Sequence, residues 1–259
     1  MGKIAFTIGP FMFHWYGLII AFSVFIGMVV TIWQTRVRGK RAKHVINLVL
    51  LGVPSGIITA RLYYVAANWK IYAGDWAETL YIWHGGLAIY GAIIGTILVV
   101  YLYTYLHKIS FGCWLDVIAP GMAIGQAIGL WGNFINQEAF GYPTDASWGI
   151  YIDFAYRPIG YEQYDYFHPA FLYESCWNIF LFLILLAVSF VQIRYKRIQP
   201  GSIFLLYIIL YSFGRFLVEG IRLDSEMIYG FRLTQIICVL SITAATWLLL
   251  RIIGLYRRG

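Results

Sequence analysis

The chain has 259 residues, of which 61% are hydrophobic, 19% aromatic and only 12% charged. An average soluble domain has about 25% charged residues, so this composition excludes an ordinary soluble protein and indicates a protein of the lipid bilayer. The net charge of +7 would suggest nucleic acid in a soluble protein. Here no RNA- or DNA-binding motif is visible, and basic loops facing anionic inner-leaflet lipid explain the charge more simply. We expect no nucleic-acid partner.

The apolar residues gather in long stretches along the chain. A bilayer core takes about 20 apolar residues per helix. No repeat, low-complexity tract or second domain interrupts the pattern, so we predict an all-α polytopic membrane protein, with residues 1–259 forming one integral-membrane domain. Its seven predicted transmembrane helices cover residues 13–34, 46–67, 86–106, 113–135, 169–192, 201–220 and 232–252.

The basic residues lie mostly between these stretches and predict the orientation. Twelve of the nineteen Lys and Arg residues fall in four short segments without any acidic residue, which the positive-inside rule assigns to the cytoplasm. Lys3 is the only charge before the first stretch, so we expect an uncleaved first helix, an external N-terminus and a cytoplasmic C-terminus. The four segments contain Arg36, Arg38, Lys40, Arg41 and Lys43; Lys108; Arg194, Lys196 and Arg197; and Arg251, Arg257 and Arg258.

The segment 136–168 is too long and too aromatic for a plain linker. We expect it to form a small extracytoplasmic cap or short helices at the interface. An ordinary aromatic belt is an alternative of equal weight.

The three cysteines are far apart, each in an apolar segment and without a C-x-x-C pair. We interpret Cys113, Cys176 and Cys238 as small buried hydrophobes, not as a disulfide or a nucleophile.

Polar residues within the apolar stretches gather at the predicted outer ends of the helices. A charge at the centre of a membrane helix costs about 2.5–3.5 kcal/mol, so such residues tend to face an interior cavity and to be functional. Tyr211, Arg215, Glu219 and Arg222 follow one another at spacings that place them on one helical stripe. The other members are His14, Tyr16, Arg61, His84, Tyr90, Asn133, Asn136, Glu138, His168, Tyr173 and Glu174. Their convergence predicts an outward- or laterally-open cavity that holds an anion, with Arg as the phosphate reader.

Each of these residues also has a structural interpretation, which the sequence leaves open. The alternatives are an ion pair of Glu219 with Arg215 or Arg222, snorkelling of Arg61 to the outer headgroups, a helix start for His168 before Pro169, and interhelical hydrogen bonds for Asn133 and Asn136. A transporter or channel is a competing function for intramembrane Arg and Glu. It needs polar residues through both leaflets, and the predicted inner half offers little beyond Asp116.

Glycines at a spacing of four predict close helix packing, because they let two backbones approach. Gly91 and Gly95 form one such pair, and Gly121, Gly125 and Gly129 form two more. The consecutive residues Gly85 and Gly86 predict a turn or a broken helix start.

The run from Gly129 to Gly141 reads G-L-W-G-N-F-I-N-Q-E-A-F-G. It resembles the signature G-R-x-G-N-F-x-N-x-E-x-x-G of the prolipoprotein diacylglyceryl transferases, and further motifs of that family follow in family order over essentially the whole chain. They are His14-Trp15-Tyr16-Gly17, Ala60-Arg61-Leu62-Tyr63-Tyr64, Trp83-His84-Gly85-Gly86-Leu87-Ala88-Ile89-Tyr90-Gly91, His168-Pro169-Ala170-Phe171-Leu172-Tyr173-Glu174 and Gly214-Arg215-Phe216-Leu217-Val218-Glu219.

The resemblance implies a multi-pass enzyme of the bacterial inner (cytoplasmic) membrane. Such enzymes move the diacylglyceryl group of phosphatidylglycerol to the lipobox cysteine of a preprolipoprotein, forming a thioether and releasing glycerol phosphate, the first step of lipoprotein maturation. The partners are then phosphatidylglycerol, lipobox signal peptides and membrane lipid, and no metal or organic cofactor is expected. The implied catalytic residues are Arg215, Tyr90, His168, Glu138 and Glu219; the implied substrate-binding residues are Tyr16, Arg61, His84, Gly129, Asn133, Asn136, Gly141, Tyr211 and Arg222.

Two departures from the family pattern bear on activity. Leu130 stands where many members carry Arg, and leucine cannot contact phosphate. The alternative function is therefore a weakly active or inactive relative that binds phosphatidylglycerol or lipoprotein signal peptides. Tyr90 stands where some relatives have His; a Tyr with its ordinary pKa near 10 is a poor base. His84 and His168 are the remaining imidazoles, and the sequence does not assign the base.

Overall fold

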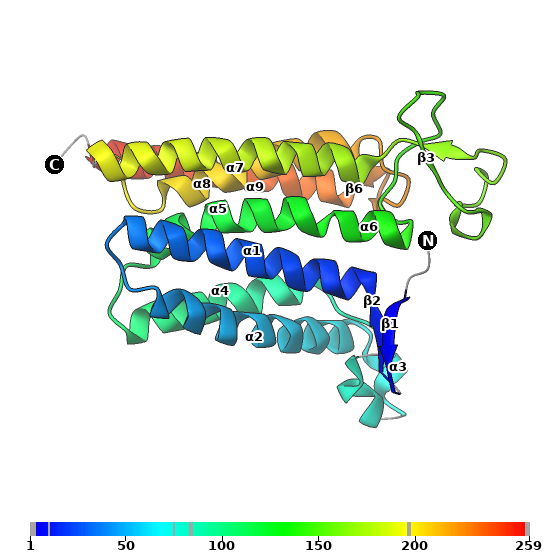
Figure 1. Cartoon of the computed structure of the whole chain (residues 1–259), viewed down its shortest axis with the longest axis horizontal. Coiled ribbons are helices and arrows are strands. Elements are labelled where there is room, and N and C mark those ends of the chain that lie inside the picture. Colours follow the sequence, from blue (N-terminus) through cyan, green and yellow to red (C-terminus); the bar gives the residue numbers. More distant parts are fainter. Residues whose placement is uncertain (1–3, 10, 75, 83–84, 196–197, 257–259) are drawn as a thin grey trace. The chain divides into compact units, whose positions relative to one another are not determined.

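The computed structural model describes residues 4–9, 11–74, 76–82, 85–195 and 198–256. Within them, seven helices are long and apolar enough to cross a membrane (Figure 1). These confirm the seven predicted spans, every end lying within three residues of its prediction. The spans are Trp15–Val37, Lys43–Ala67, Ile89–Leu106, Phe111–Asn136, Ala170–Tyr195, Ser202–Glu219 and Leu233–Gly254.

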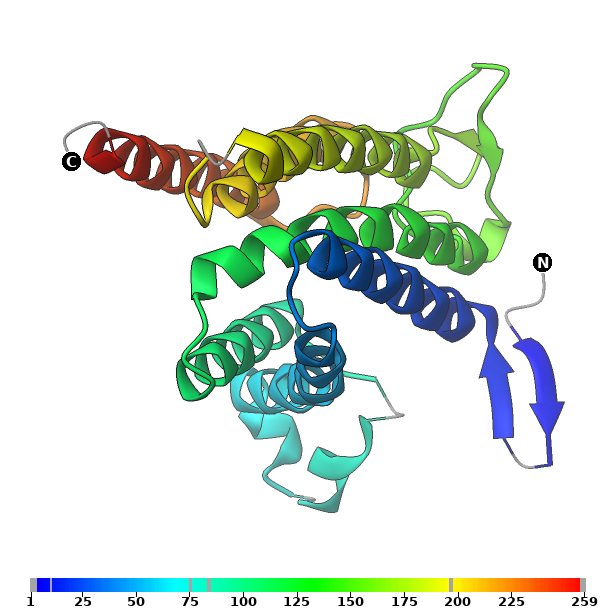
Figure 2. The same cartoon turned by 60° about the vertical axis from the view of Figure 1, so that its left-hand side comes forward.

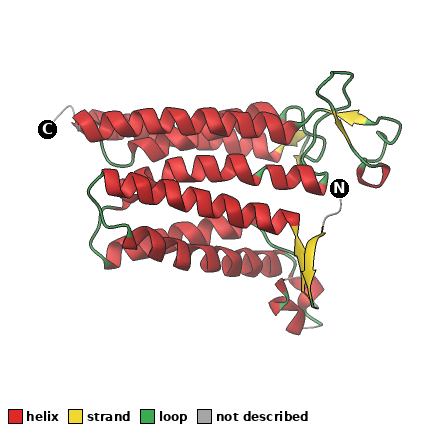
Figure 3. Ribbon diagram, viewed as in Figure 1, coloured by secondary structure: helices red, strands yellow, loops and turns green. Residues whose placement is uncertain are grey.

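In the described ranges the fold is mostly helical, with three short antiparallel strand pairs (Figure 3). The helices are α1 (Trp15–Val37), α2 (Lys43–Ala67), α3 (Trp69–Tyr72), α4 (Ile89–Leu106), α5 (Phe111–Gly129), α6 (Trp131–Asn136), α7 (Ala170–Tyr195), α8 (Ser202–Glu219) and α9 (Leu233–Tyr256), with 3₁₀ turns η1 (Ala77–Leu80) and η3 (Phe154–Tyr156). The strand pairs are β1 (Ile4–Ile8) with β2 (Phe11–His14), β3 (Ile150–Tyr151) with β4 (Tyr166–Phe167), and β5 (Met227–Ile228) with β6 (Phe231–Arg232).

The chain divides into two compact units, residues 32–114 and residues 1–31 with 115–259. In the smaller unit α2 packs on α4, and the glycines of α4 make this possible. A Cβ atom on Gly91 would lie 2.6 Å from Tyr63 Cβ and 2.9 Å from Ala60 Cα, and one on Gly95 would collide with Thr59. The predicted small-residue contact at Gly91 and Gly95 is confirmed.

In the larger unit, glycines join α1 to α5. A Cβ atom on Gly27 would lie 2.7 Å from the carbonyl oxygen of Gly121, and one on Gly125 would lie 3.3 Å from that of Ser23. The first distance leaves no room for a Cβ atom at residue 27 and the second leaves little room at residue 125, so glycine permits this approach of the two backbones. The predicted close packing at Gly121 and Gly125 is confirmed.

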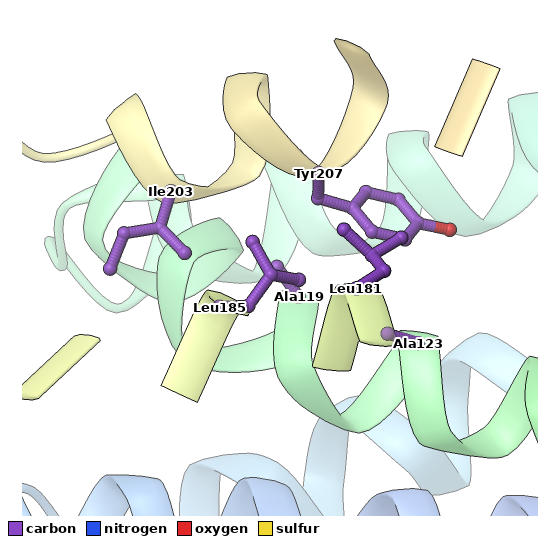
Figure 4. Packing of buried hydrophobic residues seen from close by; sticks show 6 residues of the cluster. All are labelled: Ala119, Ala123, Leu181, Leu185, Ile203 and Tyr207. Atoms are coloured by element: carbon purple, nitrogen blue, oxygen red, sulfur yellow. The ribbon is translucent and has the colours of Figure 1, made fainter. Parts of the chain in front are cut away.

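The apolar core of the larger unit lies among α5, α7 and α8 (Figure 4). The views of Figures 1 and 2 both show α7, α8 and α9 side by side, as their contacts require. Tyr207 closes this core with its ring and donates its hydroxyl to Gln126 Oε1 over 2.9 Å, so the buried phenol is satisfied. The core residues are Ala119, Ala123, Leu181, Leu185, Ile203 and Tyr207.

Asp116 of α5 fixes the N-terminal end of α8. Its carboxylate is fully buried and accepts hydrogen bonds from the backbone N–H groups of Gly201 (2.9 Å) and Phe204 (3.0 Å). Gln192 Nε2 of α7 donates a third bond over 2.8 Å. A carboxylate at a helix N-terminus is favoured by the helix dipole, so Asp116 ties α5 and α7 to the start of α8.

The segment 136–168 contains β3, η3 and β4 and folds around a small core of its own, made of Phe140, Ile152 and Phe167. Arg157 braces it by donating to the carbonyl groups of Ile152 and Glu162, each over 2.8 Å, and to a carboxylate. The segment is therefore folded, and we call residues 136–168 the cap segment. That it forms an extracytoplasmic cap, like the single-domain description of residues 1–259, stays a prediction.

All three cysteines are free thiols. Cys238 is buried as predicted, but Cys176 is exposed on the surface of α7 and Cys113 is half-buried. The prediction of burial is wrong for Cys176, because an apolar helix in a bilayer turns part of its apolar surface to lipid rather than to protein.

Candidate functional site

A buried ion-pair cluster of the larger unit joins α7 and α8 through Arg215. Its Nη1 donates to Glu174 Oε2 over 2.7 Å, and its Nη2 donates to Glu219 Oε2 over 2.6 Å. The side chains of Arg215, Glu174 and Glu219 are 16%, 7% and 2% exposed. A guanidinium has five N–H donors in a planar fork, so these two bonds orient the group and leave further donors for an anion.

The sequence places Glu174 among the outer polar residues but does not indicate its role. The signal that identifies it is its place in the His168-to-Glu174 motif, one helical turn and more after the start of α7. Its partner lies 41 positions away in the chain, so the pairing itself follows only from the packing of α7 on α8.

The predicted stripe of α8 is confirmed in part. Tyr211 and Arg215 lie on α8 with Glu219 at its end, and the Tyr211 ring stacks on that of Tyr207 with centroids 5.8 Å apart. Arg222 does not belong to the stripe, because α8 ends at Glu219 and Gly220 follows as its cap.

Arg222 instead forms a two-point ion pair with Asp224. Its Nε donates to Oδ1 over 2.8 Å and its Nη2 to Oδ2 over 2.6 Å. Burial raises the pKa of the Asp224 carboxyl, but the hydrogen bond and charge of Arg222 outweigh burial and hold the pKa below its usual value. The guanidinium of Arg222 is thus already occupied by a carboxylate.

The signature segment begins at the end of α5, passes through Leu130 and continues as α6. Gly132 receives the ring of Tyr16 from α1, because a Cβ atom there would lie 2.8 Å from Tyr16 Cδ2. The glycine therefore brings Tyr16 onto the signature, a contact that the chain order of two separate motifs does not reveal.

Glu138 of the signature is bonded to two asparagines of the same segment, through the side-chain amide of Asn136 and the backbone carbonyl of Asn133. Asn136 Nδ2 donates to Glu138 Oε1 over 3.2 Å, and the backbone N–H of Glu138 donates to the Asn133 carbonyl over 3.0 Å. Glu138 is exposed, and Gly129 faces Ile20 and Ser23 of α1 at ordinary contact distance. Within the described residues, neither asparagine side chain forms a hydrogen bond to another helix, so the structural alternative of interhelical bonding is not supported.

Gly141 joins the end of the signature to two other candidate residues. Its N–H donates to the carbonyl of His168 over 2.8 Å, and its backbone forms an antiparallel bridge with Arg222. A Cβ atom on Gly141 would lie 2.9 Å from the Ile221 carbonyl oxygen and 3.0 Å from His168 Cβ. Only glycine fits there, so Gly141 gathers segments of the chain that lie far apart in sequence.

His168 is held by a chain of side-chain hydrogen bonds that reaches the cap. Its Nδ1 lies 3.0 Å from the Tyr173 hydroxyl, which accepts a 2.8 Å bond from the indole N–H of Trp148. Indole only donates, so the phenol oxygen is the acceptor and its own proton is available to His168. Sequence reasoning missed Trp148, because nothing in the cap sequence distinguishes it from the other exposed aromatic residues.

In the smaller unit, Arg61 is buried, with 5% exposure, and its guanidinium bonds to backbone carbonyl groups. Snorkelling would require an exposed guanidinium. Tyr90 lies in the first turn of α4, partly exposed, with its ring centroid 6.3 Å from that of Tyr63. His84 lies outside the described residues.

Within the described part of the chain, no group of three or more His, Cys, Asp or Glu residues is arranged to hold a metal ion. Seven helices long and apolar enough to cross a membrane, two of them joined by a buried Arg–carboxylate cluster, define a polytopic membrane protein.

Comparison with known proteins identifies the family to which the chain belongs within this class. The family model of the prolipoprotein diacylglyceryl transferases matches residues 3–251. A relative from Synechocystis sp., named phosphatidylglycerol–prolipoprotein diacylglyceryl transferase, is 44% identical over 246 residues, which cover 95% of this chain and 87% of the relative. A relative of the same name from Listeria monocytogenes serotype 4a is 41% identical over 261 residues, covering 100% of this chain and 90% of the relative. The chain belongs to the prolipoprotein diacylglyceryl transferase family.

Proposed function

We propose that this chain transfers the diacylglyceryl group of phosphatidylglycerol to the cysteine thiol of prolipoproteins. The observation that carries the proposal is the family match over residues 3–251, which includes the signature and the Arg215 motif. The names of the relatives do not favour the alternative of a protein that only binds lipid or signal peptide.

The reaction forms one carbon–sulfur bond and breaks one carbon–oxygen bond. The substrate thiolate attacks the carbon of the diacylglyceryl group that is bonded to the phosphate oxygen, and glycerol phosphate leaves with the bonding electrons. The thiol has an ordinary pKa near 8.5, so its proton must pass to a base before or during attack. The nucleophile belongs to the substrate, which is why the chain needs no reactive cysteine of its own.

Arg215 is the group best suited to the leaving phosphate. Charge collects on the phosphate as the carbon–oxygen bond breaks, and a fixed guanidinium that strengthens its hold during this step lowers the barrier. Glu174 and Glu219 hold the guanidinium in place before the lipid arrives. Arg222 would assist only if the phosphate displaced Asp224 from it.

Each remaining candidate residue has a role in this proposal. Tyr16 and Tyr211 supply hydroxyl groups near the phosphate or glycerol, while the signature residues bind the lipid backbone and headgroup, with Glu138 as an acid–base group. His168, Tyr90 and His84 are the candidates for the base. The signature residues concerned are Gly129, Asn133, Asn136, Glu138 and Gly141.

The setting of the reaction is also part of the proposal. We expect a bacterial cytoplasmic membrane, the site in its outer half, lipobox signal peptides as protein substrates and no nucleic acid. The apolar spans support a multi-pass membrane protein, and the basic loops support the orientation.

The direct test incubates the purified chain with phosphatidylglycerol and a lipobox peptide, and follows the mass of the peptide. We expect a gain of one diacylglyceryl group, absent with a Cys→Ser peptide and strongly reduced with the Arg215→Ala variant. Equal product from wild type and Arg215→Ala, or none from wild type in active lipid mixtures, would reject the proposal. Binding of both substrates without product would support the binding alternative.

A further inference from the structure

The guanidinium of Arg61 is almost fully engaged by the protein backbone. Its Nε donates to the Thr79 carbonyl over 3.0 Å and its Nη2 to the Glu78 carbonyl over 2.6 Å. Its Nη1 donates to the carbonyls of Gly85 and Gly86, over 2.5 and 3.1 Å. Four of the five N–H donors of an Arg side chain are thus used, and all four acceptors belong to the segment that connects α2 to α4.

The same region of α2 holds the connecting segment by further contacts. The Ala88 N–H donates to the Ala60 carbonyl over 3.1 Å. Gly86 has a φ of +74°, and a Cβ atom on it would lie 2.7 Å from Arg61 Nη1 and 2.6 Å from Tyr64 Cε1. The guanidinium also lies over the ring of Tyr72, 5.2 Å from its centroid. Gly85 and Gly86, which the sequence predicts as a turn, therefore pack closely against Arg61. We call this contact of α2 with residues 85–88 the joint.

This joint leads directly into the first turn of α4, where Tyr90 lies. Within the described residues no carboxylate forms an ion pair with Arg61, so the buried charge is satisfied by carbonyl dipoles and the Tyr72 ring. A phosphate would have to draw the guanidinium away from four bonds that hold the segment, whereas Arg215 retains free donors.

We propose that Arg61 is a positioning residue: it fastens residues 78–79 and 85–86 to α2 and thereby sets the place of Tyr90, without contacting the lipid phosphate. This inference deepens the proposed function and rests on it. Lysine cannot replace Arg61 in this role, because a single ammonium at the end of a flexible stem cannot reach carbonyl groups spread along the fork of a guanidinium.

The test compares the Arg61→Lys variant, which keeps the charge, with Gly86→Ala, which disturbs the other side of the joint. For both we expect kcat to fall about tenfold or more, as small misplacements of a catalytic group do, while the KM for phosphatidylglycerol changes by less than about twofold. The double variant should lose little more than either single variant, since both break one joint. Lys70→Gln, an exposed cation on α3 of the same unit, is the matched control and should behave as wild type.

Two results would overturn the inference. One is an Arg61→Lys enzyme with normal kcat and a raised KM, which is the behaviour of a phosphate-binding cation. The other is normal kinetics for Gly86→Ala. Hydrogen exchange provides a readout independent of turnover: Arg61→Lys should accelerate exchange of the Ala88 amide by about tenfold or more, and unchanged exchange would also count against the joint. A failure of the proposed function would leave that exchange result intact.

Discussion

Arg215 of α8 and Glu174 of α7 are joined by a 2.7 Å ion pair, although 41 residues separate them in the chain. Glu219 binds the same guanidinium from one turn further along α8. Removing Arg215 therefore leaves two buried carboxylates without their cation, and breaking a buried pair costs about 3–5 kcal/mol. We predict that Arg215→Ala loses both lipid transfer and stability, measured as product formation and as the midpoint of thermal unfolding in detergent.

A triple replacement separates stability from catalysis at this cluster. Arg215→Leu with Glu174→Gln and Glu219→Gln removes the charges together, and we expect it to recover most of the lost unfolding midpoint because no buried charge remains unpaired. Lipid transfer should stay absent. Recovery of activity along with stability would mean that the cluster is only a structural ion pair.

The position of Leu130 gives a second prediction. It lies between α5 and α6 with a half-buried side chain, next to residues that line an open apolar groove of about 460 Å³ formed by Trp15, Leu18, Ile19, Phe22, Ile128 and Trp131. We expect wild type to transfer lipid and Leu130→Arg to lower the KM for phosphatidylglycerol by about two- to tenfold, since an added cation near an anionic headgroup is worth about 1 kcal/mol. Leu130→Met is the uncharged control.

The prediction would be contradicted if the wild-type protein formed no product and the Leu130→Arg variant did. This result would also revive the alternative in which the natural chain only binds its ligands.

The seven spans could be predicted because each is a long apolar run and because most basic residues lie in the loops between the runs. Both signals are local in the sequence. It predicted the glycine contacts for the same reason. It could not predict that Arg222 leaves the α8 stripe, since the helix ends at Gly220 by local capping that residue spacing does not show. Nor could it show that Arg61 faces carbonyl groups or that Trp148 reaches Tyr173, because both contacts depend on how loops fold back.

Asp116 offers a prediction about stability away from the candidate site. It is fully buried and accepts three N–H bonds, from Gln192, Gly201 and Phe204. Asp116→Ala leaves these buried donors without an acceptor, and each unsatisfied donor costs about 1–3 kcal/mol of stability. We therefore expect a marked fall of the thermal unfolding midpoint. Asp116→Asn, which keeps one carbonyl acceptor, should fall less. The rate of lipid transfer per folded molecule should change little in Asp116→Asn, and a selective loss of kcat without a loss of stability would be the contrary result.

The ion pair of Arg222 and Asp224 predicts that the stability of the protein depends weakly on pH in the acid range. The pKa of Asp224 lies below its usual value, so the stability that the pair contributes is present above the unfolded-state pKa of about 3.9 and is lost as pH falls through the lower folded-state value. The carboxylate side chain is 47% exposed, which limits the contribution to less than about 1 kcal/mol. The unfolding midpoints of wild type and Asp224→Asn should therefore differ slightly near neutral pH and converge in acid. A difference that grows on acidification would contradict this assignment.

The orientation of the chain is open to a direct test with two tags. Twelve of the nineteen basic residues lie in four segments without acids, and moving such segments across the membrane is strongly disfavoured. A tag after Gly259 should therefore be accessible only from the cytoplasm, while one inserted near the exposed residue Asp145 of the cap should be accessible from outside in intact cells. Replacing Arg38, Lys40 and Arg41 by glutamine should weaken this preference, whereas Arg157→Gln in the cap should not alter it. If the two tags show the reverse accessibility, the candidate site lies in the inner leaflet and cannot meet a lipobox cysteine on the outer side.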